Sequence, residues 1–226
     1  DMITDYVLRF LRTDMNNVKY LDLGANHAKE LSNTYKFYLS GGRGVLVEAN
    51  PELIPELEEQ RKGDVILNRV IVPSGSEKDS SEFYVMSGDG LSTVDHESAL
   101  EACRANPDIS IKCVYTVKNI TVREITDTYF KDGIDILNID LEGLEYDILS
   151  EFDFKAARPK MIILESIEYK PYLVTEKSEN KKLSELLADN NYIEYAFTGI
   201  NSLYVDRDFV SSVNSEIIGE ICGKNK

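Results

Sequence analysis

The feature that most constrains the fold of this chain is a short apolar segment, residues 18–23, that ends at a glycine. The segment has the apolar, β-branched and aromatic character of a buried strand. Gly24 permits a tight turn and lets a ligand approach the backbone closely. Apolar residues at helical spacing over residues 28–39 predict a helix after the turn. A strand, a glycine turn and a helix N-terminus together predict a nucleotide-type binding edge in an open α/β sheet.

A second predicted strand, residues 45–48, supports this interpretation because it ends in an acidic residue, Glu48. A carboxylate at this place can accept hydrogen bonds from both ribose hydroxyls of an adenosine. The turn itself reads Gly24-Ala25-Asn26, with asparagine where a dinucleotide fingerprint has its second glycine. The pattern therefore disfavours a pyrophosphate that rests on bare backbone, and it favours a ligand with adenosine but no phosphate.

A third motif follows a nearly pure apolar run, residues 134–139, which predicts a central strand buried on both faces. Asp140 stands at the carboxyl end of this run, where open α/β sheets bind ligands. The three motifs resemble the signature blocks of the FkbM-type methyltransferases, and they occur in that family's order. They are Asp22-Leu23-Gly24-Ala25-Asn26, Val47-Glu48-Ala49-Asn50-Pro51 and Asn138-Ile139-Asp140-Leu141-Glu142-Gly143-Leu144-Glu145. The clear departure is Ala28, where the family usually has glycine.

The resemblance extends from about residue 18 to residue 205 and implies a class I enzyme that uses S-adenosylmethionine (SAM) and releases S-adenosylhomocysteine. It implies an α/β fold with a Rossmann-like, mostly parallel sheet, a C-terminal antiparallel hairpin, and helices on both faces. The cofactor site that it implies consists of Asp22, Gly24, Ala25, Asn26, Glu48, Ala49, Asn50, Asn68, Arg69 and Asp140. Within that site we expect Asp22, Gly24 and Asn26 at the methionine end of SAM. Glu48 is expected at the ribose and Asn68 on the adenine side.

Asp140 and Glu142 are the main candidates for catalysis. Methyl transfer from a sulfonium is an in-line displacement, and a hydroxyl is a poor nucleophile unless a carboxylate or imidazole accepts its proton. His96, which follows a glycine loop, is a further candidate for this base. Structural alternatives stay open, because Asp140 can cap the next helix, Glu142 can pair with a neighbouring base, and His96 can lie on a solvated loop. Mg²⁺ held by the two carboxylates is another alternative.

We expect one domain over residues 1–226, with a helical segment at residues 1–17 and an insertion at about residues 80–118. In the insertion, alternating apolar and polar residues predict an antiparallel hairpin that encloses a short helix. At the other end of the chain, residues 192–197 and 202–205 predict a second hairpin across a short turn.

Local signals predict further elements. The apolar residues of the N-terminal helix that share one face are Ile3, Tyr6, Val7, Phe10 and Leu11. Asn50 and Pro51 predict the start of a helix that ends near residue 62. One strand is expected over residues 65–72, and a loop over residues 169–177 is expected at the acceptor wall. Thr121 and Glu124 fit a capping box at the start of another helix.

Charge and composition exclude several classes of function. The chain has 40 acidic and 25 basic residues, and its net charge of −15 argues against nucleic acid or an anionic membrane as a partner. No apolar run approaches the roughly 20 residues that span a bilayer. Cys103, Cys113 and Cys222 lack metal-ligand spacing and are expected to be reduced thiols of a cytoplasmic protein. The sequence gives no indication of oligomeric state.

The expected function is a SAM-dependent O-methyltransferase that acts on a hydroxyl of a carbohydrate or glycan. FkbM relatives act largely on hydroxyls of sugars, glycans and small metabolites, so the resemblance implies a role in polysaccharide biosynthesis. An NAD-linked oxidoreductase is an alternative on the same kind of fold, and the missing second glycine disfavours it. A non-catalytic SAM-binding domain of a larger glycan-assembly protein is the other alternative, and it would need no base such as Asp140.

Overall fold

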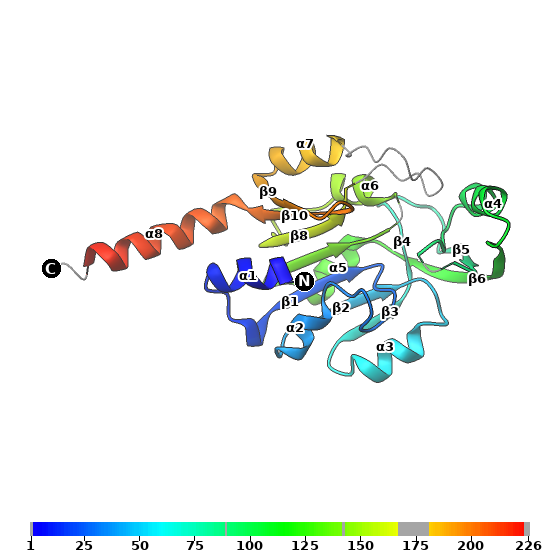
Figure 1. Ribbon diagram of the computed structural model, residues 1–226, viewed down its shortest axis with the longest axis horizontal. Coiled ribbons are helices and arrows are strands. Elements are labelled where there is room, and N and C mark those ends of the chain that lie inside the picture. Colours follow the sequence, from blue (N-terminus) through cyan, green and yellow to red (C-terminus); the bar gives the residue numbers. More distant parts are fainter. Residues whose placement is uncertain (1, 89, 142, 167–180, 224–226) are drawn as a thin grey trace.

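The computed structural model describes residues 2–88, 90–141, 143–166 and 181–223, with side chains described as far as residue 215. Its central element is a seven-stranded sheet in the order β3-β2-β1-β7-β8-β10-β9 (Figure 1). The parallel strands are β1 (Lys19–Leu23), β2 (Arg43–Glu48), β3 (Val65–Asn68), β7 (Ile136–Ile139) and β8 (Met161–Glu165). The antiparallel hairpin consists of β9 (Tyr192–Phe197) and β10 (Asn201–Asp206). The predicted mostly parallel sheet with a C-terminal hairpin is confirmed.

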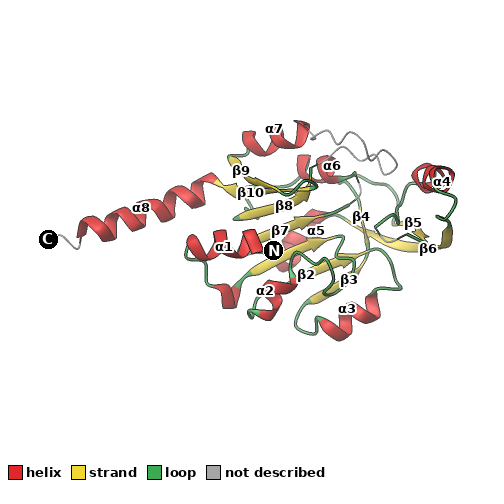
Figure 2. Ribbon diagram, viewed as in Figure 1, coloured by secondary structure: helices red, strands yellow, loops and turns green. Residues whose placement is uncertain are grey.

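Helices cover both faces of this sheet, as predicted (Figure 2). One face packs against α5 (Val122–Tyr129), α6 (Glu145–Ser150) and α7 (Lys181–Asp189). The other face packs against α1 (Met2–Phe10), α2 (Tyr35–Leu39), α3 (Ile54–Gln60) and α8 (Arg207–Gly223). A short 3-10 helix, η1 (Met15–Asn17), leads into β1. The two cores follow from strand alternation, because Leu21 and Leu23 of β1 enter the first cluster whereas Tyr20 enters the second.

The predicted insertion forms a second, three-stranded sheet in the order β4-β6-β5. Its strands are β4 (Val70–Ile71), β5 (Ser80–Met86) and β6 (Ile111–Ile120), and α4 (His96–Ala105) connects β5 to β6. The antiparallel pairing of β5 with β6 confirms the predicted hairpin. Phe83, Val85 and Val117 form a small core with Val70 of β4. This core fixes the insertion to the end of β3, beside the carboxyl edge of the main sheet.

The predicted helix over residues 28–39 is wrong for most of its length, because only α2 is helical there. Asn26 and Leu31 have φ values of +49° and +56°, which a regular right-handed helix excludes. Thr34 is buried, and its hydroxyl donates to the Asp22 carboxylate at 2.6 Å. The glycine turn is therefore followed by a loop and not directly by a helix.

Two helices differ from their predicted form. α1 exists as expected, but it buries Val7 and Leu8 while Tyr6 and Phe10 stay exposed, so the face that packs is rotated from the predicted one. α3 begins at Ile54 rather than at Pro51. The Asn50 side chain accepts a hydrogen bond from the backbone N–H of Glu52 at 3.0 Å, and it thereby makes a turn before the helix.

The predicted strand over residues 65–72 is divided at Arg69 into β3 and β4, which belong to different sheets. The capping box of Thr121 and Glu124 at the start of α5 is confirmed. The predicted acceptor-wall loop at residues 169–177 lies outside the described residues. α8, the long C-terminal helix in Figure 1, was not expected, because its sequence has little amphipathic pattern.

Candidate active site

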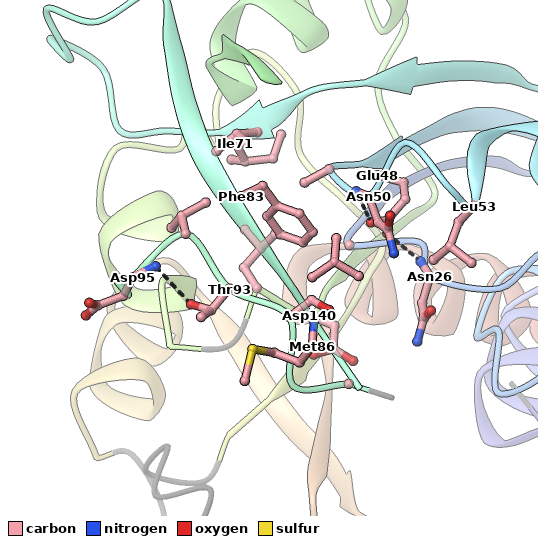
Figure 3. A pocket seen from close by; sticks show the side chains of 18 of the residues that line it. Asn26, Glu48, Asn50, Leu53, Ile71, Phe83, Met86, Thr93, Asp95 and Asp140 are labelled. Carbon is pink, nitrogen blue, oxygen red and sulfur yellow. Dashed lines mark hydrogen bonds between the residues drawn. The ribbon is translucent and has the colours of Figure 1, made fainter. Parts of the chain in front are cut away.

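A cavity of about 690 Å³ lies at the carboxyl ends of β1, β2 and β7. Its volume is within the range of about 300–1,000 Å³ that is usual for small-molecule sites. Gly24, Glu48 and Asp140 come from the three strand ends, and the insertion supplies the wall that includes Phe83 and Met86 (Figure 3). The position agrees with the rule that open α/β sheets bind ligands outside the carboxyl ends of their strands.

The glycine turn is shaped by contact between two strand ends. Gly24 has a φ of +80°, and a Cβ atom added there would collide with the backbone carbonyl of Asp140. The N–H groups of Gly24 and Ala25 both donate to the carbonyl of Val47, at 3.0 and 3.1 Å. Only glycine allows this close approach, because any larger residue would push the Asp140 segment away from β1.

Glu48 connects the two loops that border the cavity. One carboxylate oxygen accepts from the backbone N–H of Asn26 at 2.8 Å, and the other accepts from that of Asn50 at 2.7 Å. Burial raises the pKa of Glu48, while these backbone donors oppose the shift. Each carboxylate oxygen can accept more than one hydrogen bond, so Glu48 retains acceptor capacity toward the cavity that it lines.

Of the residues predicted to bind the cofactor, those that line the cavity are Gly24, Asn26, Glu48, Ala49, Asn50, Arg69 and Asp140. Asp22, Ala25 and Asn68 lie behind this surface and are not part of the described lining. The Asn68 amide donates to the carbonyls of Glu48 and Ala49, at 2.9 and 3.0 Å. Asn68 thus supports the loop after β2 instead of presenting its amide to the cavity.

Asp22 is buried, and both of its carboxylate oxygens accept hydrogen bonds from other side chains. Its two carboxylate oxygens accept from the Thr34 hydroxyl at 2.6 Å and from the Asn138 amide at 2.8 Å, and the residue is 1% exposed. Burial raises its pKa. Arg61 extends the network, since it donates to Thr34 at 3.1 Å and to Asp64 at 2.8 Å. This placement gives Asp22 a positioning role, in which it fixes β1, β7 and the loop after Gly24 relative to each other.

Of the predicted catalytic residues that the structure describes, Asp140 is the one that lines the cavity. Burial within the cavity walls, together with the nearby carboxylates of Glu145 and Asp22, raises its pKa from 3.8 to about 6. Its side chain remains accessible from the cavity that it lines. A carboxyl group that is accessible and titrates near neutral pH fits a proton acceptor.

Glu145 is a supporting residue that the sequence reasoning missed. Its carboxylate accepts from the N–H of Leu141 at 2.8 Å and from that of Gly143 at 3.1 Å, so it holds the loop after Asp140. The available signal was its place in the first turn of α6, where acids favour the helix dipole. Glu142, the other predicted catalytic carboxylate, lies outside the described residues.

The structure does not bring His96 to the cavity. His96 begins α4, its ring stacks on Tyr84 with centroids 5.1 Å apart, and it is not part of the described lining. The predicted base role of His96 therefore gains no support from the geometry. His27 does line the cavity edge, where its Nδ1 pairs with Glu56 at 3.1 Å.

The insertion supplies further lining residues, none of which belongs to the three sequence motifs. They include Phe83, Met86, Thr93, Asp95 and Lys112. The Glu52 carboxylate accepts from the Tyr115 hydroxyl at 3.0 Å, which links β6 to the loop after Glu48. In the view of Figure 3, Asn26 and Glu48 stand on one side of Asp140, and Thr93 and Asp95 stand on the other. The cavity thus extends in two directions from Asp140.

Among the described residues, no group of three or more histidines, cysteines or carboxylates is arranged to hold a metal ion. Nor does the described part of the chain contain a helix with the length and apolar character to cross a bilayer.

Comparison with known proteins yielded a family match and similarities to solved structures. A family model described as the methyltransferase FkbM domain matches residues 22–194. The structure is similar to that of a fibrillarin pre-rRNA processing protein from Methanococcus jannaschii, with a TM-score of 0.43 and 12% identity. That match covers 85% of this chain and 67% of the other chain. No protein of curated function matches the sequence.

Proposed function

The chain belongs to the FkbM methyltransferase family, and from this premise we propose that it transfers the methyl group of SAM to a hydroxyl of a carbohydrate or glycan. Use of SAM as the methyl donor follows from the family. The choice of a hydroxyl acceptor, and of a carbohydrate, is our proposal. A role in polysaccharide biosynthesis in the cytoplasm is part of the same proposal.

The residues around the cavity fit SAM. Glu48 retains acceptor capacity at the end of β2, where it suits the two ribose hydroxyls of an adenosine. Leu53, Val70 and Ile71 add apolar surface suited to an adenine ring. Gly24 keeps the turn open to close approach, since it has no side chain. When bound, SAM supplies a methyl group that is electrophilic because it is carried by a positively charged sulfur.

The observation that carries the proposal is Asp140, an accessible carboxylate with a raised pKa at the carboxyl end of a central strand. In our account the acceptor hydroxyl gives its proton to Asp140 while the acceptor oxygen forms its bond to the methyl group. The insertion wall and the loop after β7 enclose the reacting groups and hold the hydroxyl in line. The proton later leaves to solvent through the open side of the cavity.

The two alternative functions fit less well. For an NAD-linked oxidoreductase, the turn would have to offer free backbone N–H groups to a pyrophosphate. The N–H groups of Gly24 and Ala25 instead donate to Val47, and that of Asn26 donates to Glu48. A binding domain without catalysis would not require an accessible carboxylate of raised pKa beside the cofactor residues.

The proposal is tested by incubating the protein with SAM and a panel of sugars and glycans, with S-adenosylhomocysteine and methylated product measured by mass spectrometry. Asp140→Asn should lower turnover at least about 100-fold, in line with the loss of a general base, and change SAM affinity less than about 3-fold. The matched control is Asp147→Asn on the exposed side of α6, which should retain full turnover. Equal losses of turnover and SAM affinity in Asp140→Asn would place Asp140 in cofactor binding instead.

A further inference from the structure

The part of the cavity farthest from Glu48 is formed by the insertion. Met86, Thr93 and Asp95 line it, and Asp140 is drawn between them and Glu48 in Figure 3. Two hydroxyls here are fixed by backbone donors: Ser92 accepts from the N–H of Met86 at 3.1 Å, and Thr93 accepts from that of Asp95 at 3.1 Å. This wall is therefore an ordered surface on the side of Asp140 away from the predicted cofactor residues.

Lys112 lines the same cavity, and its position in β6 is irregular. Val85 of β5 pairs with Cys113, whereas the next residue, Met86, pairs with Ile111. Lys112 is the extra residue of a β-bulge at this point. Without the bulge, strand alternation would place Lys112 on the face of β6 that carries the exposed residue Val114. Bulges often redirect a side chain next to an active site, and this one brings Lys112 to the cavity lining.

Neither Lys112 nor Arg69, the other Lys or Arg residue in the described lining, takes part in an ion pair with a described residue. As a residue of the cavity lining, Lys112 can therefore pair with an anionic ligand.

Other carboxylates of the cavity lining already accept hydrogen bonds from groups of the protein. Glu48 accepts from two backbone N–H groups, and Glu52 accepts from the Tyr115 hydroxyl. Asp95 is the N-cap of α4 and accepts from the N–H groups of Glu97 and Ser98. Asp140 keeps its carboxylate open, but its pKa of about 6 shows that its surroundings disfavour further negative charge without compensation. Lys112, elsewhere in the lining of the same cavity, supplies a positive charge with which an anionic ligand can pair.

We propose that the insertion wall with Lys112 is the acceptor subsite, and that it takes a carbohydrate bearing a carboxylate or phosphate group. This inference rests on the proposed function, because it assigns a charge to the acceptor of that reaction. Lys112 would bind the anionic group, and the hydroxyls of Ser92 and Thr93 would donate to neighbouring sugar oxygens. A protein of net charge −15 repels anions at long range, so an acidic acceptor requires such a local cation.

The test is calorimetric titration of the protein saturated with S-adenosylhomocysteine, with glucose, glucuronate and glucose 6-phosphate as probes at low salt. At least one acidic sugar should bind more tightly than glucose, and the better of the two identifies carboxylate or phosphate as the preferred group. Lys112→Met should weaken that binding about 5- to 10-fold, the effect of losing one charged hydrogen bond at a partly solvated site. Lys118→Met, on the same strand but outside the described lining, should bind like the wild type.

Two results would overturn the inference: neither acidic sugar binds the wild type better than glucose, or Lys112→Met binds acidic sugars as well as the wild type does. Failure of the proposed function looks different, because the same instrument would then detect no binding of S-adenosylhomocysteine before any sugar is added. Lys112 and Lys118 are both exposed, so neither substitution should alter the circular dichroism spectrum.

Discussion

At the scale of single residues, Asp140 combines accessibility from the cavity with a raised pKa, two properties that seldom occur together. It is open to the cavity, yet its surroundings hold its pKa near 6, because the cavity walls and the carboxylates of Glu145 and Asp22 disfavour its charged form. The ionised residue therefore costs folding free energy at neutral pH, which is the usual relation between an active-site group and stability. We expect Asp140→Asn to keep or raise the melting temperature at pH 7, as measured by calorimetry.

The raised pKa of Asp140 predicts how turnover depends on pH. A proton acceptor works only when ionised, so turnover should fall as the pH drops through about 6 and should level off above it. Bound SAM carries positive charge, which favours the carboxylate, but the small expected change in SAM affinity of Asp140→Asn limits the shift, so this acid limb should stay close to 6 at saturating SAM. The measurement is turnover between pH 5 and 8 for the wild type and Asp140→Asn. An identical acid limb in the variant would assign the titration to another group.

Gly24 provides a second test at this scale, because two glycines with positive φ differ only in their surroundings. Gly24 and Gly75 have φ values of +80° and +89°, but a Cβ on Gly24 would meet the Asp140 carbonyl, while one on Gly75 meets nothing within 4 Å. Gly75→Ala should cost about 1–2 kcal/mol, the backbone term alone. Gly24→Ala should cost more and should abolish SAM binding, as measured by urea unfolding and titration. Equal effects would show that the close approach is unimportant.

At the scale of elements, the sequence predicted the strands better than the segments between them. The strands ending at Leu23, Glu48 and Ile139 were predicted because buried parallel strands have continuous apolar sequence that little else imitates. The loop before α2 has apolar residues at helical spacing, and this spacing alone predicts a helix. What decides its conformation is a buried polar network around Thr34 and Arg61, which joins residues far apart in the sequence.

The residues of the candidate site likewise fall into those that the sequence predicts and those that depend on long-range pairing. Gly24, Glu48 and Asp140 could be predicted because each follows directly from a strand end. Lys112 of the insertion wall could not, since it reaches the cavity through a register shift that depends on pairing with β5. Asp22 and Asn68 were predicted to bind the cofactor, but their side chains form long-range hydrogen bonds inside the protein instead.

The network around Arg61 gives a prediction about stability. Arg61 is fully buried, pairs with Asp64 at 2.8 Å, and lies 5.0 to 5.7 Å from the ring centroids of Tyr20, Tyr35 and Tyr38. Arg61→Met should cost about 3–5 kcal/mol in the free energy of unfolding, because it removes the counter-charge of the buried Asp64 carboxylate, to which only the neutral donors Tyr20 and Gly44 then remain. Arg123→Met, which breaks an exposed pair with Asp127, should cost at most about 1 kcal/mol. Urea unfolding compares them, and similar costs would contradict the structural role.

At the scale of the whole molecule, two sheets meet at one cavity. The large sheet supplies the strand ends that carry Gly24, Glu48 and Asp140, and the small sheet of the insertion supplies the opposite wall. The residues assigned to the methionine and ribose of SAM follow strands of the large sheet, and Val70 and Ile71 of β4 add surface for the adenine. The residues assigned to the acceptor lie in β6 and in the loop after β5. Changes confined to the insertion should therefore alter the choice of acceptor while leaving SAM affinity intact.

The most direct test of the account is a calorimetric titration of the wild type and Glu48→Gln with SAM, and of the wild type with NAD. We predict micromolar binding of SAM and no binding of NAD by the wild type. Glu48→Gln should weaken SAM binding at least about 10-fold, or 1.4 kcal/mol, through loss of a charged hydrogen-bond acceptor. Glu58→Gln on the exposed side of α3 should bind SAM normally. Binding of NAD, or absence of SAM binding by the wild type, would contradict the assignment of this cavity to methyl transfer.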